Sequence, residues 1–215
     1  MLKIAIQMDP IEAVNVNADT SFDLALEAFS RGHEIWVYQP EMLQLDCGVV
    51  RARARQVEHL KREQGDHVKL AAPQVIDLHG LDVVLVRQDP PFNMAYITAA
   101  QILERLLPDV LVLNNPRSIR DAPEKLFVTD FKDLTPPTLI TRDAEAMHAF
   151  RKTHGDVIVK PLYGNGGAGV FKMSSDDSNF KALLELFSEA YAEPSIIQKY
   201  LPAVTKGDKR IILLD

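Results

Sequence analysis

A glycine-rich loop that begins with a lysine is the segment of this chain best suited to chemistry. The run Lys160–Gly169 carries four glycines within six residues, namely Gly164, Gly166, Gly167 and Gly169. Glycine backbone presents N–H groups to phosphate oxygens without obstructing side chains. A dinucleotide site would need a helix directly after the loop, where the sequence predicts a strand, and no Gly-Lys-Ser/Thr ends the loop as in a Walker A site. The loop therefore predicts a phosphate-binding hairpin, with a flexible hairpin tip as the alternative.

Three further segments could complete a nucleotide site. Lys125 precedes the glycine loop, although a solvated lysine on a helix is an alternative interpretation. Ile196–Pro202 predicts an apolar strand that leads into a mixed stretch, which can offer backbone hydrogen bonds to a purine edge or simply form an edge strand. Gly207–Ile211 places one acid and two bases before a further strand, or forms a charged turn.

The elements that would position these segments differ along the chain. In the first part, strands alternate with helices, which predicts a parallel, doubly wound sheet. The expected strands are Leu2–Met8, Glu34–Tyr38, Leu81–Val86 and Val110–Leu113, and the expected helices are Thr20–Gly32 and Ala95–Leu107. Residues 42–78 between them predict hairpin strands and loops.

The second part predicts short antiparallel strands with interspersed helices. Asp143 is expected to cap a helix that Gly155 ends. The expected helices are Pro123–Phe131, Ala144–Lys152 and Asn179–Tyr191, and the expected strands are Thr138–Thr141, Val157–Lys160, Val170–Met173, Ser195–Tyr200 and Lys209–Leu214. The chain thus predicts two domains, an α/β domain over residues 1–122 and an α+β domain over residues 123–215.

Composition narrows the class of protein. The 215 residues are 47% hydrophobic and 25% charged, as in ordinary soluble globular proteins. A net charge of −6 argues against a broad surface for nucleic acid or anionic membrane, and no apolar run is long enough to span a bilayer. Cys47 is the single cysteine, so an internal disulfide is impossible, and we expect a cytoplasmic location with this thiol partly buried.

Together and in this order, these segments resemble the ATP-grasp superfamily and, within it, the bacterial glutathione synthetase family. The Lys-Pro-Leu-x-Gly-x-Gly-Gly run and the Asp-Pro-Pro-Phe loop are the most specific motifs. The resemblance covers essentially the whole chain and implies a pre-ATP-grasp domain followed by an incomplete ATP-grasp domain. It is carried by Met8–Pro10, Asp19–Phe22, Arg87–Phe92, Asn115–Asp121, Glu124–Phe127, Lys160–Gly167, Tyr200–Pro202 and Gly207–Arg210.

This resemblance implies ATP-dependent ligation of γ-glutamylcysteine with glycine through an acyl phosphate. It implies that Lys125 and Lys160 contact the ATP phosphates while the loop of Gly164, Gly166 and Gly167 closes as a lid. It further implies that Asp208 holds the ribose hydroxyls and that the catalytic Arg210 neutralises charge on the transferring phosphoryl group. The residues that it implies for the adenine pocket are Gln198, Lys199, Tyr200 and Leu201.

The resemblance also implies a magnesium ion and a homo-oligomer. The family's Mg²⁺ ligands are expected beyond Asp215, so no metal ligand is assigned here, and we expect the 215 residues alone to be inactive in the full reaction. Nucleic acid and membrane are not expected partners. Two rival hypotheses stay open: another ATP-grasp ligase, such as one that makes D-alanyl-D-alanine or adds glutamate to a protein tail, and a non-catalytic nucleotide-binding or oligomerisation module. The Asp-Pro-Pro-Phe loop weighs against the first rival.

Overall fold

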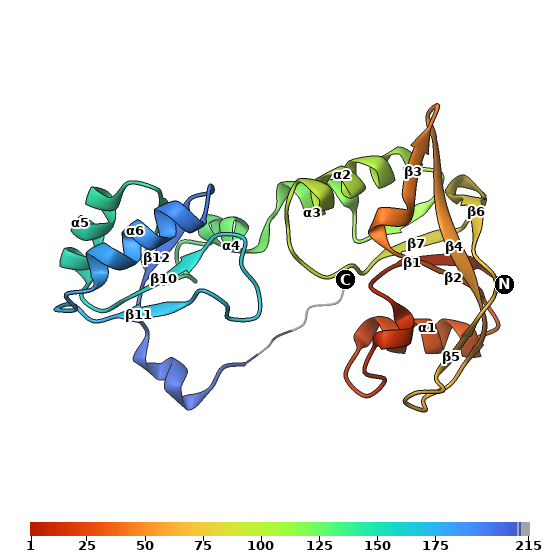
Figure 1. Ribbon diagram of the computed structural model, residues 1–215, viewed down its shortest axis with the longest axis horizontal. Helices are drawn as coiled ribbons and strands as arrows, with labels where there is room; N and C mark the ends of the chain where they lie inside the picture. Colours follow the sequence, from red (N-terminus) through yellow and green to blue (C-terminus); the bar gives the residue numbers. More distant parts are fainter. Residues whose placement is uncertain (210, 212–215) are drawn as a thin grey trace. The chain divides into compact units, whose positions relative to one another are not determined.

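The chain forms two compact units, Met1–Ala122 and Pro123–Asp215, in a computed structural model that describes residues 1–209 and residue 211. Each unit contains its own sheet, and each sheet is built from strands of one unit (Figure 1). The helices of the described residues include none with the length and apolar character that spanning a bilayer demands.

Parallel strands form the centre of the first unit. Their order is β2 (Glu34–Tyr38), β1 (Lys3–Gln7), β7 (Val83–Val86) and β8 (Leu111–Leu113). Helix α1 (Thr20–Ser30) connects β1 to β2, and the Asp19 side chain caps it by accepting a hydrogen bond from the Phe22 N–H at 2.8 Å. The predicted β-α-β opening with a parallel sheet is confirmed.

Helices cover both faces of this sheet, because successive side chains of a strand point to opposite faces. On one face, Phe22 and Ala25 of α1 join a buried cluster with Ile4 and Ile6 of β1. On the other, Leu103 of α2 (Met94–Leu103) packs in a cluster that contains Ala5, Trp36 and Val84. This arrangement confirms the doubly wound prediction for the parallel strands (Figure 1).

An antiparallel arm extends the same sheet. The long strand β4 (Val49–Leu60) pairs with β2 and also with β3 (Leu43–Asp46), β5 (Val68–Leu70) and β6 (Gln74–Asp77). The hairpins predicted for residues 42–78 are therefore present, but they make the sheet mixed. The prediction of a partly buried Cys47 is wrong: this residue is exposed, since it forms the two-residue turn between β3 and β4 with Gly48, where side chains point to solvent.

The second unit has a four-stranded antiparallel sheet in the order β11 (Phe171–Met173), β10 (Val157–Pro161), β12 (Ser195–Lys199) and β9 (Thr138–Thr141). Helices α5 (Ala144–His154) and α6 (Phe180–Ala190) lie on one face of it (Figure 1). Their Met147, Phe180 and Leu184 pack on Val157 and Val159. The predicted Asp143 cap is confirmed, and Gly155 ends α5 with a φ of 78°.

Short helices fill the connections. The predicted helix Pro123–Phe131 is α4 (Glu124–Phe127) followed by a 3₁₀ turn, and α3 (Pro116–Asp121) precedes it. Of the predicted strand Lys209–Leu214, the structure describes Lys209 and Ile211, neither of which lies in a strand, and the other residues lie outside the described part. The 3₁₀ turns are Ile11–Ala13, Pro40–Met42, Leu78–Gly80, Glu104–Leu106, Val128–Asp130 and Pro202–Lys206.

Candidate functional site

The glycine loop connects two antiparallel strands of the second unit. Val157 of β10 lies opposite Met173 of β11, and Val159 lies opposite Phe171, so the loop is the tip of a hairpin as predicted. A strand follows the loop, which confirms that it is not a dinucleotide-binding turn. The loop lines a cavity of about 240 Å³ together with the side chains of Lys125 and Lys160.

Lys160 projects from the sheet face opposite to α5 and α6. Its neighbours Val159 and Pro161 are buried, while Lys160 itself is half-buried, as strand alternation requires. Its Nζ donates a hydrogen bond to Oε1 of Gln198 at 3.3 Å. The Gln198 Nε2 in turn donates to Oγ1 of Thr138 at 2.7 Å. These two hydrogen bonds connect side chains of β10, β12 and β9 and hold the Lys160 ammonium group at the cavity.

The two lysines make the cavity electropositive. Burial is the main cause that lowers the pKa of Lys160, and repulsion from Lys125 lowers it further, while Glu124 acts in the opposite direction. Glu124 is the nearest acid, 3.9 Å from Nζ of Lys125, but its side chain is 87% exposed, so solvent screens its charge. An anion in the cavity would relieve the repulsion between the lysines, which is the electrostatic condition for a phosphate site.

Lys125 joins the connector to the glycine loop. It lies in α4, and its Nζ donates a hydrogen bond to the backbone oxygen of Gly164. Its side chain is 23% exposed, unlike a solvated helix lysine. Since an ammonium group has three donors, two N–H bonds stay available for an anion while the loop contact is kept.

Two properties of the loop require glycine. A β-carbon at position 164 would lie 2.7 Å from Cγ of Pro161, closer than real contacts allow. Gly166 and Gly167 have φ angles of 59° and 77°, in the left-handed region that residues with a β-carbon rarely adopt. Glycine at these positions therefore lets the loop follow this path and line the cavity with its backbone.

The expected adenine-contacting residues lie at the end of β12 and do not line this cavity. The backbone N–H of Lys199 donates to Pro137 at 2.9 Å, and that of Tyr200 donates to Asp156 at 2.9 Å. The Tyr200 ring also contacts the Lys172 ammonium group, 4.1 Å from the ring centre. Leu201 is half exposed. Of the four predicted residues, Gln198 is therefore the one that the structure joins to the lysines.

The last two predicted residues lie farther along the chain. Asp208 is exposed after the 3₁₀ turn Pro202–Lys206, and among the described residues nothing links it to the cavity. Arg210 lies outside the described residues, so its catalytic role stays a prediction. Within residues 1–209 and 211, no group of three or more His, Cys, Asp or Glu side chains is arranged to hold a metal ion.

Sequence reasoning missed Thr138, which fixes the amide of Gln198. The sequence marks it as the first residue of a strand after two prolines. Only the pairing of β12 with β9 places it opposite Gln198. Strand alternation alone gives no such signal, because it does not tell which strands are neighbours.

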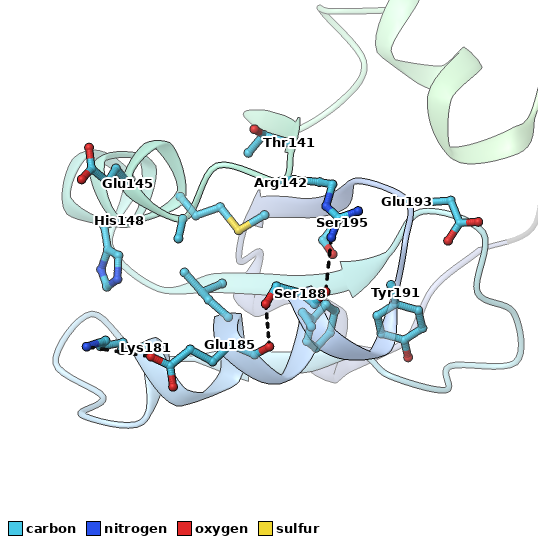
Figure 2. A pocket seen from close by; sticks show the side chains of 14 residues that line it. Thr141, Arg142, Glu145, His148, Lys181, Glu185, Ser188, Tyr191, Glu193 and Ser195 are labelled. Carbon is cyan, nitrogen blue, oxygen red and sulfur yellow. Dashed lines mark hydrogen bonds and ion pairs between the residues drawn. The ribbon is translucent and has the colours of Figure 1, made fainter.

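A larger cavity of about 290 Å³ lies between α5 and α6, away from both lysines (Figure 2). Met147, Leu184 and Phe187 line it with mixed charged side chains. Its Arg142 guanidinium donates to the backbone oxygens of Ser188, at 3.2 Å, and of Ala192. That cation is committed to the end of α6, so the smaller lysine cavity is the better candidate for anion chemistry.

Solved structures with a similar fold include an ATP-grasp protein and a D-cycloserine synthetase. An ATP-grasp RimK domain protein from Sphaerobacter thermophilus aligns with a TM-score of 0.58 at 18% identity. The alignment includes 93% of this chain and 64% of that protein. The D-cycloserine synthetase DcsG aligns with a TM-score of 0.61 at 17% identity, over 94% of this chain and 60% of the synthetase. The chain therefore has the fold of an ATP-grasp protein, with a lysine–glycine cavity in its second unit.

Sequence comparison narrows the class further. The model of the prokaryotic glutathione synthetase N-terminal domain matches residues 2–120, and that of the family's ATP-grasp domain matches residues 124–215. The glutathione synthetases of Brucella melitensis and Mesorhizobium japonicum are 52% and 53% identical over the whole chain, which spans 68% of their length. The chain belongs to the prokaryotic glutathione synthetase family, and the resemblance read from its motifs is confirmed.

Proposed function

We propose that this chain acts in the ATP-dependent ligation of γ-glutamylcysteine with glycine, which gives glutathione. In that reaction the cysteinyl carboxylate attacks the γ-phosphorus of ATP and ADP leaves, which gives an acyl phosphate. The glycine amine then attacks the acyl carbon, loses a proton and displaces phosphate. The observation that carries the proposal is the single cavity in which Lys125, Lys160 and the glycine loop meet.

The cavity supplies what phosphoryl transfer requires of a protein. That chemistry depends mainly on holding the phosphates in place and balancing their charge. Two lysines provide the charge, and Gln198 and Gly164 hold the two ammonium groups in position. Closure of the glycine loop over ATP would also keep water away from the acyl phosphate.

The other nucleotide contacts extend from the same sheet. We place adenine at the end of β12, beside Lys199, Tyr200 and Leu201, because this segment directly follows Gln198. Asp208 would accept hydrogen bonds from the ribose hydroxyls, and Arg210 would neutralise charge on the transferring phosphoryl group. ATP-grasp ligases generally use ATP with Mg²⁺. We propose that this ion accompanies ATP here as well; the described residues gather no group of three or more His, Cys, Asp or Glu side chains that could hold it.

The cellular setting is part of the same proposal. Both substrates are small and soluble, and we infer a cytoplasmic enzyme that acts as a homo-oligomer without nucleic-acid or membrane partners. An exposed, unpaired Cys47 is compatible with the reducing conditions of the cytoplasm.

The test is glycine-dependent ADP release by the full-length natural chain with ATP, Mg²⁺ and γ-glutamylcysteine. Loss of one well-placed donor to a transition state slows catalysis by about a hundredfold to a thousandfold. We expect a loss of this size in Lys160→Ala and a normal rate in Lys181→Ala, whose lysine lies on α6 and pairs with Glu185 at 3.8 Å. Equal rates in wild type and Lys160→Ala would contradict the proposed role of the cavity.

A further inference from the structure

Both ends of the glycine loop pack on Pro161, the buried last residue of β10. A β-carbon at Gly164 would lie 2.7 Å from Cγ of Pro161, and one at Gly169 would lie 3.1 Å from its Cδ. Lys125 also holds the first end, through its hydrogen bond to the Gly164 carbonyl. The two glycines therefore lie against one rigid ring, and residues 165–168 between them are the part of the loop that is free to move.

The side chain of Tyr191 lies against the second end of the loop. A β-carbon at Gly169 would be only 3.0 Å from the Tyr191 hydroxyl. Tyr191 is the first residue after α6, and its backbone N–H donates to the Phe187 carbonyl at 3.0 Å. The position of this tyrosine is therefore set by α6. Gly169 has a φ of 71°, which a residue with a β-carbon rarely adopts, so the loop keeps this place next to the hydroxyl open.

Aromatic rings extend this contact to the strand after the loop. The centroid of the Tyr191 ring lies 5.3 Å from that of Phe187, which in turn lies 5.8 Å from that of Phe171 on β11. Phe187 is buried, and ring pairs at such distances attract each other. The exit of the glycine loop is thus joined to α6 through three rings as well as through the hydroxyl.

The Tyr191 hydroxyl is an unused polar group. Among the described residues it has no hydrogen-bond partner, although the side chain is half-buried. On its other side the ring lines the cavity between α5 and α6, which leaves the ring room to shift (Figure 2). A donor without a partner therefore lies next to a loop whose backbone can still move, and a small displacement of either one is enough to form a hydrogen bond.

We propose that Tyr191 is a positioning residue for the closed glycine loop. Its hydroxyl donates a hydrogen bond to the loop backbone when residues 165–168 close over ATP, and its ring holds the pivot at Gly169. The closure rests on the proposed function, because it requires ATP at the lysine cavity, whereas the pivots at Gly164 and Gly169 do not depend on it. Tyr191 touches no phosphate in this scheme and acts through the loop alone.

NMR relaxation of the backbone amides, measured without nucleotide, tests the two pivots. We expect order parameters below about 0.6 across residues 165–168 and near about 0.85 at Gly164, Gly169 and Phe171. In Tyr191→Leu, which removes both the ring and the hydroxyl, the low values should extend through Gly169 to Phe171 while Gly164 stays ordered. An unchanged exit in a folded Tyr191→Leu chain, verified by thermal unfolding, would contradict the role of the ring.

Titration of Tyr191→Phe with ATP tests the hydroxyl. One neutral hydrogen bond changes affinity by roughly twofold to tenfold. We expect Tyr191→Phe to bind ATP more weakly by that factor, and its loop amides to exchange faster than those of wild type only when ATP is bound. Its midpoint of urea unfolding without ATP should equal that of wild type, because the hydroxyl has no partner there. A merely structural role would lower this midpoint and leave ATP affinity unchanged.

Tyr96→Phe is the matched control, since Tyr96 is a half-buried tyrosine of the first unit, and it should bind ATP like wild type. Equal ATP affinity in wild type and Tyr191→Phe would overturn the role of the hydroxyl, and so would a folded wild-type chain that binds no ATP. Lys160→Ala separates this outcome from that of the proposed function. Weak binding in Tyr191→Phe with normal binding in Lys160→Ala would leave the role of Tyr191 standing and remove that of the lysine cavity. The reverse result would do the opposite.

Discussion

The chain contains two loops that follow strands and present cationic groups, and they are built in opposite ways. The loop that begins at Arg87 is fastened by the backbone carbonyl and side chain of Gln7 and by the Asp9 carboxylate. In the glycine loop of the second unit, the Lys125 side chain donates a hydrogen bond to the backbone oxygen of Gly164. The turn of this loop is closed by a bond from the Ala168 N–H to the Asn165 oxygen at 3.1 Å.

This difference indicates different tasks. A loop held by hydrogen bonds to a buried strand end keeps one geometry, which suits recognition of a small rigid group. A loop rich in glycine gains order only when a partner supplies the missing hydrogen bonds, which suits a lid over phosphates.

Hydrogen exchange should separate the two loops most clearly. Among the described residues, the N–H groups of Gly166 and Gly167 have no acceptor, whereas those of Arg87 and Asp89 are bonded. A hydrogen bond worth about 1.4 kcal/mol slows exchange by roughly tenfold. We expect the glycine amides to exchange at least that much faster than those of Arg87 and Asp89, and to slow when ATP is added.

Amide exchange followed by NMR, with and without ATP, measures this contrast. The Arg87 amide is the internal control, since ATP should leave it unchanged. Slow exchange at Gly166 without nucleotide would contradict the lid interpretation.

Substitution of Gly164 should disturb the glycine loop through sterics. In Gly164→Ala the new methyl group would lie 2.7 Å from Cγ of Pro161, so the loop or the proline must move. Overpacking of this kind costs about 1 to 3 kcal/mol. We expect lower ATP affinity by titration and a lower free energy of unfolding in urea. Gly80→Ala is the matched control, because nothing lies within 4 Å of its added carbon, and its stability should stay near that of wild type.

The affinity for ATP should fall as the pH rises from neutral toward 10.5, the ordinary pKa of lysine. Burial and Lys125 lower the pKa of Lys160, so its charge is lost earlier than that of an exposed lysine. The stability of the protein without ATP should change in the opposite direction. The unfolded state holds the Lys160 proton more tightly than the folded state, so the contribution of this group to the free energy of unfolding increases as the pH rises through the lowered pKa.

Titration of ATP binding against pH tests this dependence. At the alkaline end of the range, Lys160→Arg should lose less ATP affinity than wild type, by a few-fold, since a guanidinium stays protonated there. Lys125→Ala should move the loss of affinity to higher pH, because it removes one cause of the shift. Identical profiles in wild type and Lys160→Arg would show that another group controls the pH dependence.

The smallest effect is expected from Thr138→Val. This change removes the hydroxyl that accepts a hydrogen bond from Gln198 and donates one to the Pro136 carbonyl at 2.8 Å, and each such bond contributes about 1 kcal/mol. We expect a loss of stability of about 2 kcal/mol. ATP binding should weaken by a few-fold, because the Gln198 amide no longer has a fixed orientation toward Lys160. Thr98→Val removes an exposed hydroxyl that bonds within its own helix, and it should leave ATP binding unaltered.

Much of this molecule follows from local sequence. Apolar runs identified β1, β2, β7 and β10, Asp143 and Gly155 marked the two ends of α5, and the strand after Gly169 showed that the glycine loop is a hairpin. These features depend on interactions between residues close in the chain: alternation of side chains, capping hydrogen bonds, and the backbone freedom of glycine. Lys125 and Lys160 could be selected as phosphate ligands because family motifs carry them.

Only the tertiary structure decided which distant residues meet. The antiparallel arm joins the main sheet through β4 and β2, and Cys47 is exposed because that arm ends in a two-residue turn. Thr138 meets Gln198 across 60 residues, and Arg87 meets Ser21 across 66. Such pairs depend on which strands become neighbours and in which register. That choice is made by packing of whole faces against α1, α2, α5 and α6, and no local pattern around a single residue encodes it.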